Sequence, residues 1–160
     1  MRKAIIQLMG SVIVLLTAWP VSARNDKYLL PISSALQSKD AREIPDGSIK
    51  FFFGKKETPE IVTQLGSYST HQRSSTRPSE DAKACNVAFL KALVILQKRA
   101  QQLGANAVVN IASYYKNDTL SSATEFECHA GVSAHVMLKG DQTQKERHDE
   151  KSYPGGVYCR

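Results

Sequence analysis

The chain has 160 residues, of which 42% are hydrophobic and 22% are charged, and its formal net charge is +6. A chain of this length normally forms one domain around one hydrophobic core, so two independent domains are excluded. The positive charge is modest and spread along the sequence. It therefore does not indicate a nucleic-acid-binding protein.

The first 23 residues have the pattern of an export signal. Arg2 and Lys3 precede an uncharged stretch rich in Ile, Val and Leu, which ends in small residues suited to a signal peptidase. We expect cleavage between Ala23 and Arg24, which leaves about 137 residues with a net charge of about +4. The alternative is an uncleaved anchor, because residues 4–23 could span a bilayer of about 30 Å. No cysteine near the cleavage site could accept a lipid.

The three cysteines are expected to form one disulfide, because export places the chain where disulfides form and persist. Cys85 and Cys128 lie in the part of the chain with the strongest hydrophobic patterns, whereas Cys159 is next to the last residue of a polar tail. We predict a bridge between Cys85 and Cys128. Cys159 is then free, capped by glutathione or paired with a second molecule.

The segment after the signal is expected to contain a short helix and a buried strand. The apolar spacing at 29, 32 and 36 suits an amphipathic helix, with Pro31 in its first turn. Residues 48–53 are dense in Ile and Phe and follow a turn signal, so they predict a buried strand. The phrase Gly54-Lys55-Lys56 lacks the glycines of a Walker loop and predicts a turn with solvated lysines.

The next segment is more polar. Residues 59–65 fit either one helical turn or a second short strand, and residues 66–73 alternate enough for an edge strand. Residues 69–79 are rich in Ser, Thr, Arg and Pro, and we expect a mobile loop there.

A long core helix is predicted over residues 79–103. Ser79 suits the N-cap, Glu80 and Asp81 favour the positive end of the helix dipole, and Gly104 suits the left-handed residue that ends the helix. One apolar stripe recurs at three- and four-residue steps: Cys85, Phe89, Ala92, Leu96, Ala100 and Leu103.

Two strands are predicted after the helix. Residues 105–115 are apolar and β-rich, so we expect a central strand that is buried on both sides along its first half. Residues 116–122 are expected to form a polar turn. Residues 124–138 alternate as one strand, in which Gly131 could mark a bulge. Residues 141–160 lack apolar periodicity and are expected to be a disordered charged tail.

These elements predict a single α+β domain over residues 24–140. Its small, mostly antiparallel sheet has three to five strands and packs on one long helix, and the disulfide pins that helix to a strand.

Part of the chain resembles the signalling domain of the outer-membrane stress sensor of the Rcs phosphorelay. The matching features are a cysteine before a helix, the phrase Leu103-Gly104-Ala105-Asn106-Ala107-Val108-Val109, and a strand with Cys128 followed by small residues. The same Gly-Ala-Asn-Ala-Val phrase is similar to small YbjQ-type domains. The resemblance implies a helix packed on a small sheet, a disulfide between them and a non-catalytic sensing role. The chain departs from the sensor by having no lipid-bearing cysteine, no long proline-rich linker and one matching disulfide rather than two.

The whole mature sequence is also similar to uncharacterised secreted proteobacterial proteins often labelled excinuclease ATPase subunit. The similar phrases are Tyr114-Tyr115-Lys116 and Glu127-Cys128-His129-Ala130-Gly131. An ATPase would need a P-loop, which the sequence lacks, and a DNA-repair subunit would not carry an export signal. We therefore do not expect the activity that this label describes.

The strongest candidate for a functional site in the sequence is a metal site. On one strand, alternation places Glu125, Glu127, His129 and His135 on one face, and imidazoles with carboxylates can hold a metal ion. However, positions 129 and 135 would be about 20 Å apart on a continuous strand. One ion could not reach both, so a site would need a partner such as His71, and we expect solvated histidines instead.

The sequence gives no clear support for nucleophilic catalysis. There is no nucleophile elbow, and Cys128 and His129 are neighbours that point to opposite faces of a strand. Tyr114 and Tyr115 could belong to a binding face, although packing is the more common role of strand tyrosines.

The sequence thus predicts an exported, periplasmic or secreted, non-enzymatic binding or envelope-sensing module. We expect no catalytic residue, no cofactor and no metal ligand. The partner would be an envelope protein or a small ligand, without nucleic acid and without a stable membrane anchor after cleavage, and a small homo-oligomer would be compatible. The alternatives are an envelope hydrolase and a metal-handling protein.

Overall fold

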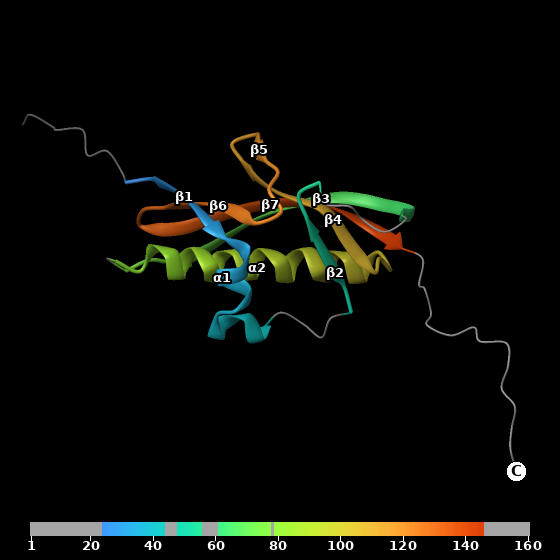
Figure 1. Ribbon diagram of the computed structural model, residues 1–160, viewed down its shortest axis with the longest axis horizontal. Coiled ribbons are helices and arrows are strands. Elements are labelled where there is room, and N and C mark those ends of the chain that lie inside the picture. The colour runs from blue at the N-terminus through green and yellow to red at the C-terminus, as the bar shows by residue number, and fades with distance from the viewer. Residues whose placement is uncertain (1–23, 44–47, 56–60, 78, 146–160) are drawn as a thin grey trace, which may run out of the picture.

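The computed structural model describes residues 24–43, 48–55, 61–77 and 79–145. The predicted signal peptide and Cys159 lie outside these ranges. The described elements in chain order are β1 (Asp26–Pro31), α1 (Ile32–Leu36), the 3-10 helix η1 (Lys39–Glu43), β2 (Lys50–Phe53), β3 (Ile61–Ser75), α2 (Asp81–Gln102), β4 (Ala107–Tyr115), β5 (Asp118–Leu120), β6 (Glu125–Ala130) and β7 (Ser133–Lys145). The long helix α2 runs along one face of the sheet (Figure 1).

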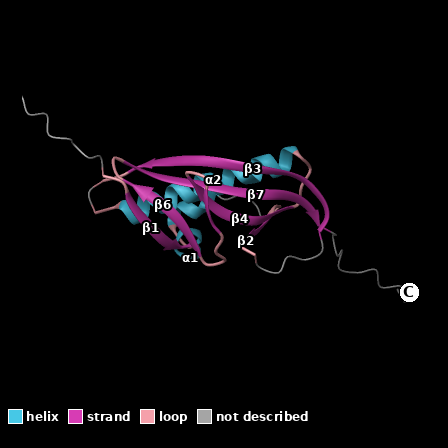
Figure 2. Ribbon diagram, turned by 90° about the horizontal axis from the view of Figure 1, so that it is seen from above, coloured by secondary structure: helices cyan, strands magenta, loops and turns pink. Residues whose placement is uncertain are grey.

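The centre of the sheet is β7. It pairs with β3 on one side, and on its other side it pairs first with β6 and then with β4, all antiparallel. β1 extends the sheet beyond β6, and β2 pairs in parallel with β4. The α+β class and the mostly antiparallel sheet are confirmed. The predicted number of strands was wrong, because the described residues form seven strands and not three to five. The sheet is strongly curved (Figure 2).

The polar segment before α2 is one long strand, not a mobile loop. β3 covers 15 residues, and its register with β7 runs from Ile61 opposite Lys145 to Ser75 opposite Ser133. The prediction of an edge strand was right, but the loop expected from residue 69 begins only after Ser75. Composition misled because β3 is held by backbone hydrogen bonds to a central strand, which need little apolar burial.

The stretch predicted as one strand over residues 124–138 is a hairpin. β6 ends at Ala130, β7 begins at Ser133, and the turn between them contains Gly131 and the highly exposed Val132. The hairpin places His129 directly opposite His135. β7 then continues to Lys145, so residues 141–145 belong to the sheet and not to a disordered tail.

The segment after the expected cleavage site is mainly a strand. β1 covers residues 26–31 and pairs with β6, and the short helix α1 begins only at Ile32, with Pro31 as its N-cap. The start of α2 also differs from the prediction. Ser79 has a positive φ of 66°, and the N-cap is Glu80. At the other end Gly104 has a φ of +71°, which confirms its predicted role in ending the helix.

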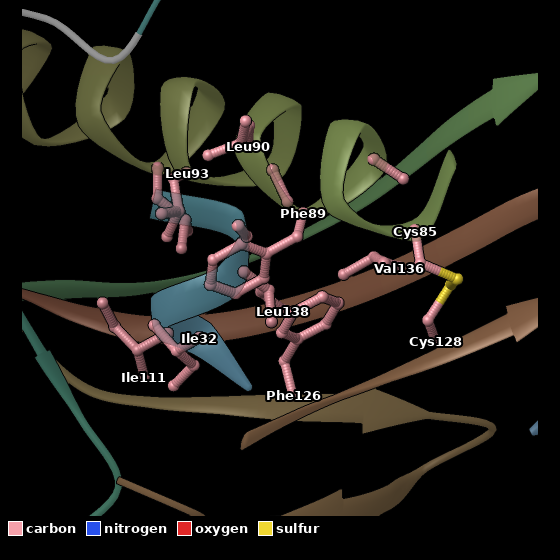
Figure 3. Packing of buried hydrophobic residues seen from close by; sticks show 14 of the residues in the cluster. Ile32, Cys85, Phe89, Leu90, Leu93, Ile111, Phe126, Cys128, Val136 and Leu138 are labelled. Carbon is pink, nitrogen blue, oxygen red and sulfur yellow. A yellow bond between two sulfur atoms is a disulfide. The ribbon is translucent and has the colours of Figure 1, made fainter. Parts of the chain in front are cut away.

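The core lies between α2 and the sheet (Figure 3). Phe89 of the helix stacks on Phe126 of β6 with ring centroids 4.1 Å apart, and both rings are almost fully buried. The predicted disulfide is confirmed: Cys85 of α2 is bonded to Cys128 of β6, with Cα atoms 5.8 Å apart and both residues fully buried. The first half of β4 is buried on both faces, as predicted.

Candidate functional site

The face of the sheet opposite α2, here called the outer face, carries most of the polar groups that could bind or react. Along β7, Ala134, Val136 and Leu138 point into the core, so the alternating residues between and around them lie on the outer face. On β6, Phe126 and Cys128 point inward and their neighbours point outward. The β4–β5 hairpin rises from this side of the sheet, away from α2 (Figure 1).

One cluster on the outer face is buried although it is polar. Glu127 and His129 of β6 are only 8% and 7% exposed. His129 Nε2 lies 2.6 Å from Glu127 Oε1, and Lys27 Nζ of β1 lies 2.8 Å from Glu127 Oε2. The ring of Tyr115, at the end of β4, stacks on the His129 ring with centroids 3.5 Å apart. Tyr115 therefore closes the cluster, and the expectation that His129 is solvated was wrong.

The charge of Glu127 is stabilised by its neighbours. Burial by itself raises the pKa of Glu127, but the hydrogen bonds and positive charges of Lys27 and His129 outweigh burial, and the net pKa lies below its ordinary value. The backbone N–H of Glu127 also donates to Ser113 Oγ of β4 at 2.9 Å. A satisfied, ionised carboxylate that is 8% exposed is a structural link between β1, β6 and β4, because little of it is open to a ligand.

A second cluster joins two histidines from distant parts of the chain. His71 of β3 and His135 of β7 lie on diagonal cross-strand positions, with His71 Nε2 3.0 Å from His135 Nδ1. The other ring nitrogen of His135 lies 2.8 Å from Ser133 Oγ. His71 is exposed and His135 is half-buried, so solvent reaches the pair.

The surroundings of His135 favour its neutral form. Burial, followed by the neighbouring His71, Arg73 and His129, lowers the pKa of His135 below its ordinary value of 6.5. Ser133, His135 and His71 follow the order of a nucleophile, a base and an orienting group. A hydrolase also needs a substrate pocket and donors for an oxyanion at the serine. The groove described next does not include Ser133.

A groove of about 460 Å³ lies further along the outer face, over β3, β7 and β4. This volume is within the range of small-ligand sites, roughly 300 to 1,000 Å³. Lys139 Nζ lies 4.5 Å from the centre of the Tyr114 ring and 2.8 Å from Thr119 Oγ1. The groove is lined by Ser67, Tyr68, Ser69, Asn110, Tyr114, Lys139, Gly140 and Asp141.

The floor of the groove is held in place by polar contacts. Asp141 accepts hydrogen bonds from Ser67 Oγ and from Asn110 Nδ2, the latter at 2.9 Å. Asn110 has a φ of 52° where the register between β4 and β7 shifts, which makes it the extra residue of a bulge. Gly140 is needed here because a Cβ would lie 2.7 Å from Val108 Cγ1. The bulge and the glycine bring the side chains of three strands together around one hollow.

The predicted metal set is only partly brought together. Glu125 is exposed and does not join Glu127 and His129. The separation of about 20 Å between His129 and His135 was wrong, because the hairpin makes them opposite neighbours. His71, named as the partner that a site would need, does reach His135. Within the described ranges, no group of three or more His, Cys, Asp and Glu side chains is placed to hold a metal ion.

Other sequence predictions about chemistry have clear outcomes. Cys128 and His129 point to opposite faces as expected, and Cys128 is in the disulfide. Tyr114 lines the groove and Tyr115 covers the buried cluster. The groove residues of β7 were missed because residues from 141 onward were assigned to a tail. The alternating pattern of residues 133–143, although polar, was the signal that could have indicated a continuous strand.

No protein-family model matches the chain, and no curated protein matches it. Among the helices of the described residues, none combines the length and apolar character that crossing a membrane requires. The disulfide suggests an oxidising compartment. The fold and the site define a disulfide-bonded α+β domain with a polar groove on the outer face of its sheet.

Proposed function

We propose that this protein is an exported, non-enzymatic binding or envelope-sensing module whose ligand site is the groove on the outer face. The observation that carries the proposal is the groove itself, which is of ligand size and has an aromatic wall, a lysine and a carboxylate held on rigid strands. Such a combination of apolar surface with a few fixed polar groups is typical of binding sites.

The chemistry of the groove favours a polar ligand without a large net charge. Lys139 and Asp141 contribute one positive and one negative charge, and Asn110, Ser67 and Ser69 add neutral polar groups. The exposed part of the Tyr114 ring offers a flat apolar surface. A small polar molecule, or an extended segment of an envelope protein, would fit these features.

Export is part of the same proposal. Its support is the signal-like sequence of residues 1–23 and the Cys85–Cys128 disulfide, which would be reduced in most cytosols. Mass spectrometry of the non-reduced protein from cells should find a chain that begins at Arg24 and carries this bridge. A full-length chain with reduced thiols at both positions would contradict export.

The groove is tested by placing a photo-crosslinking residue at Ser69, an exposed position on its wall, in the exported protein. Val132, 92% exposed at the tip of the β6–β7 hairpin, is the matched control position. We expect a discrete adduct from Ser69 and none from Val132, and we expect Tyr114→Ala to remove it. No adduct from Ser69, or the same adducts from both positions, would refute the groove as the ligand site.

A further inference from the structure

We propose that His71 and His135 form a two-imidazole binding site for a divalent transition metal ion, with Cu²⁺ the tightest. The site lies on the outer face and joins the edge strand β3 to the central strand β7. It is separate from the groove, so either proposal can fail without the other.

The two nitrogens lie as far apart as neighbouring metal ligands do, but their rings lie almost end to end, with centroids 5.2 Å apart, as in a hydrogen bond. Both rings must therefore turn for their lone pairs to converge on one ion. With metal–nitrogen bonds of about 2.0 to 2.1 Å, two ligands lie about 2.9 Å apart at a right angle and about 3.3 Å apart at the tetrahedral angle. His71 Nε2 and His135 Nδ1 are 3.0 Å apart. Square-planar and tetragonal sites have right-angled ligands and are typical of Cu²⁺ and Ni²⁺, and the affinity order of such ions places Cu²⁺ first.

Ser133 supports the tautomer of His135 that a metal needs. In the metal-binding tautomer, His135 Nε2–H donates to Ser133 Oγ at 2.8 Å, which leaves the lone pair of Nδ1 directed toward His71. Metal-bound histidines usually donate their other ring N–H to such a partner. His71 then carries its proton on Nδ1, and its Nε2 lone pair completes the pair of ligands.

The site is open to solvent. His71 is exposed and His135 half-buried, so a metal ion can enter and water can fill the remaining coordination positions. The charged or titratable groups that also face His135 are Arg73, directly opposite on β3, and His129, directly opposite on β6. The guanidinium of Arg73 repels a cation, so it weakens the site but does not block it.

The test is Cu²⁺ titration of the mature protein, made without a histidine tag and with Cys159 alkylated under non-reducing conditions. Calorimetry should find one Cu²⁺ per chain, and electron paramagnetic resonance should show coupling to two imidazole nitrogens. His71→Gln and His135→Gln should each weaken binding by at least about tenfold, the low end of the loss seen for even an outer partner of a metal ligand. Each variant should also lose one nitrogen coupling.

Arg73→Gln is the matched control, because it changes an outer-face neighbour of the same pair without removing an imidazole. It should bind Cu²⁺ at least as tightly as the wild type. In the unmodified protein, Cu²⁺ should broaden amide signals around residues 71 and 135 before those of α2, which tests the position without any variant. The proposal is overturned if the His71→Gln/His135→Gln double variant binds Cu²⁺ as well as the wild type does, which is the result that adventitious binding at His148 would give. It is also overturned if Arg73→Gln weakens Cu²⁺ binding as much as His71→Gln does.

Discussion

The disulfide should supply a large part of the stability of this protein. The bridge between Cys85 and Cys128 spans a sequence separation of 43 residues. In the chain-entropy model, closing a loop of that length removes about 13 cal/mol/K from the unfolded chain, which is about 4 kcal/mol at 25 °C. Small domains have a total free energy of unfolding of about 5 to 15 kcal/mol, so removing the bridge should leave a marginal fold.

The measurement compares urea unfolding of the oxidised wild type with that of Cys85→Ala/Cys128→Ala, followed by circular dichroism. We expect the variant to lose about 4 kcal/mol, and somewhat more because two fully buried sulfur atoms are also removed. The urea dependence of its unfolding free energy should be steeper, since the unfolded variant is less compact. Cys159→Ala is the control and should unfold like the wild type. A loss below about 1 kcal/mol would refute the loop-entropy reasoning.

Two further predictions test the packing of the sheet and the buried charge. Gly140→Ala should destabilise by about 1 to 3 kcal/mol, because the added Cβ would lie 2.7 Å from Val108 Cγ1. Gly66→Ala should be tolerated, because its added Cβ would lie 3.9 Å from the nearest atom. Equal urea midpoints for Gly140→Ala and Gly66→Ala would contradict this steric argument. The pKa of Glu127 is lowered in the folded state, so its contribution is complete above its ordinary value of 4.5 and is lost as the pH falls through the lowered value. At pH 7 the wild type has an ionised Glu127 paired with Lys27, so Glu127→Gln should have a clearly smaller free energy of unfolding than the wild type. This difference in unfolding free energy should become smaller by pH 3. If the difference in unfolding free energy between the wild type and Glu127→Gln does not change with pH, the charge of Glu127 is not its cause.

The core helix and the cysteine pairing could be predicted because their signals are local. The apolar stripe of α2 repeats at helical spacing, and Phe89 and Cys85 are buried in the way that this spacing requires. Gly104 ends the helix because a left-handed residue is needed there, and glycine adopts that conformation without strain. Such features need only a few neighbouring residues, so a single sequence contains them in full.

The strand assignments failed where pairing, and not composition, decides the structure. Residues 69–75 look like a loop, but the backbone of β7 supplies partners for their N–H and C=O groups. The turn at Gly131 and Val132 was missed because the run on each side of it continues the same alternation. That error placed His129 and His135 far apart, when they are direct neighbours across two strands.

The sequence by itself determined the class of the fold, the long helix, the disulfide and the export-like start of the chain, since each depends on residue type and short-range spacing. Only the tertiary structure decided what lies on the outer face of the sheet. His71 meets His135, and Lys27 meets Glu127, because β7 and β6 bring strands from distant parts of the chain into register. Register between strands depends on hydrogen bonds and packing over the whole sheet, and no short segment encodes it alone.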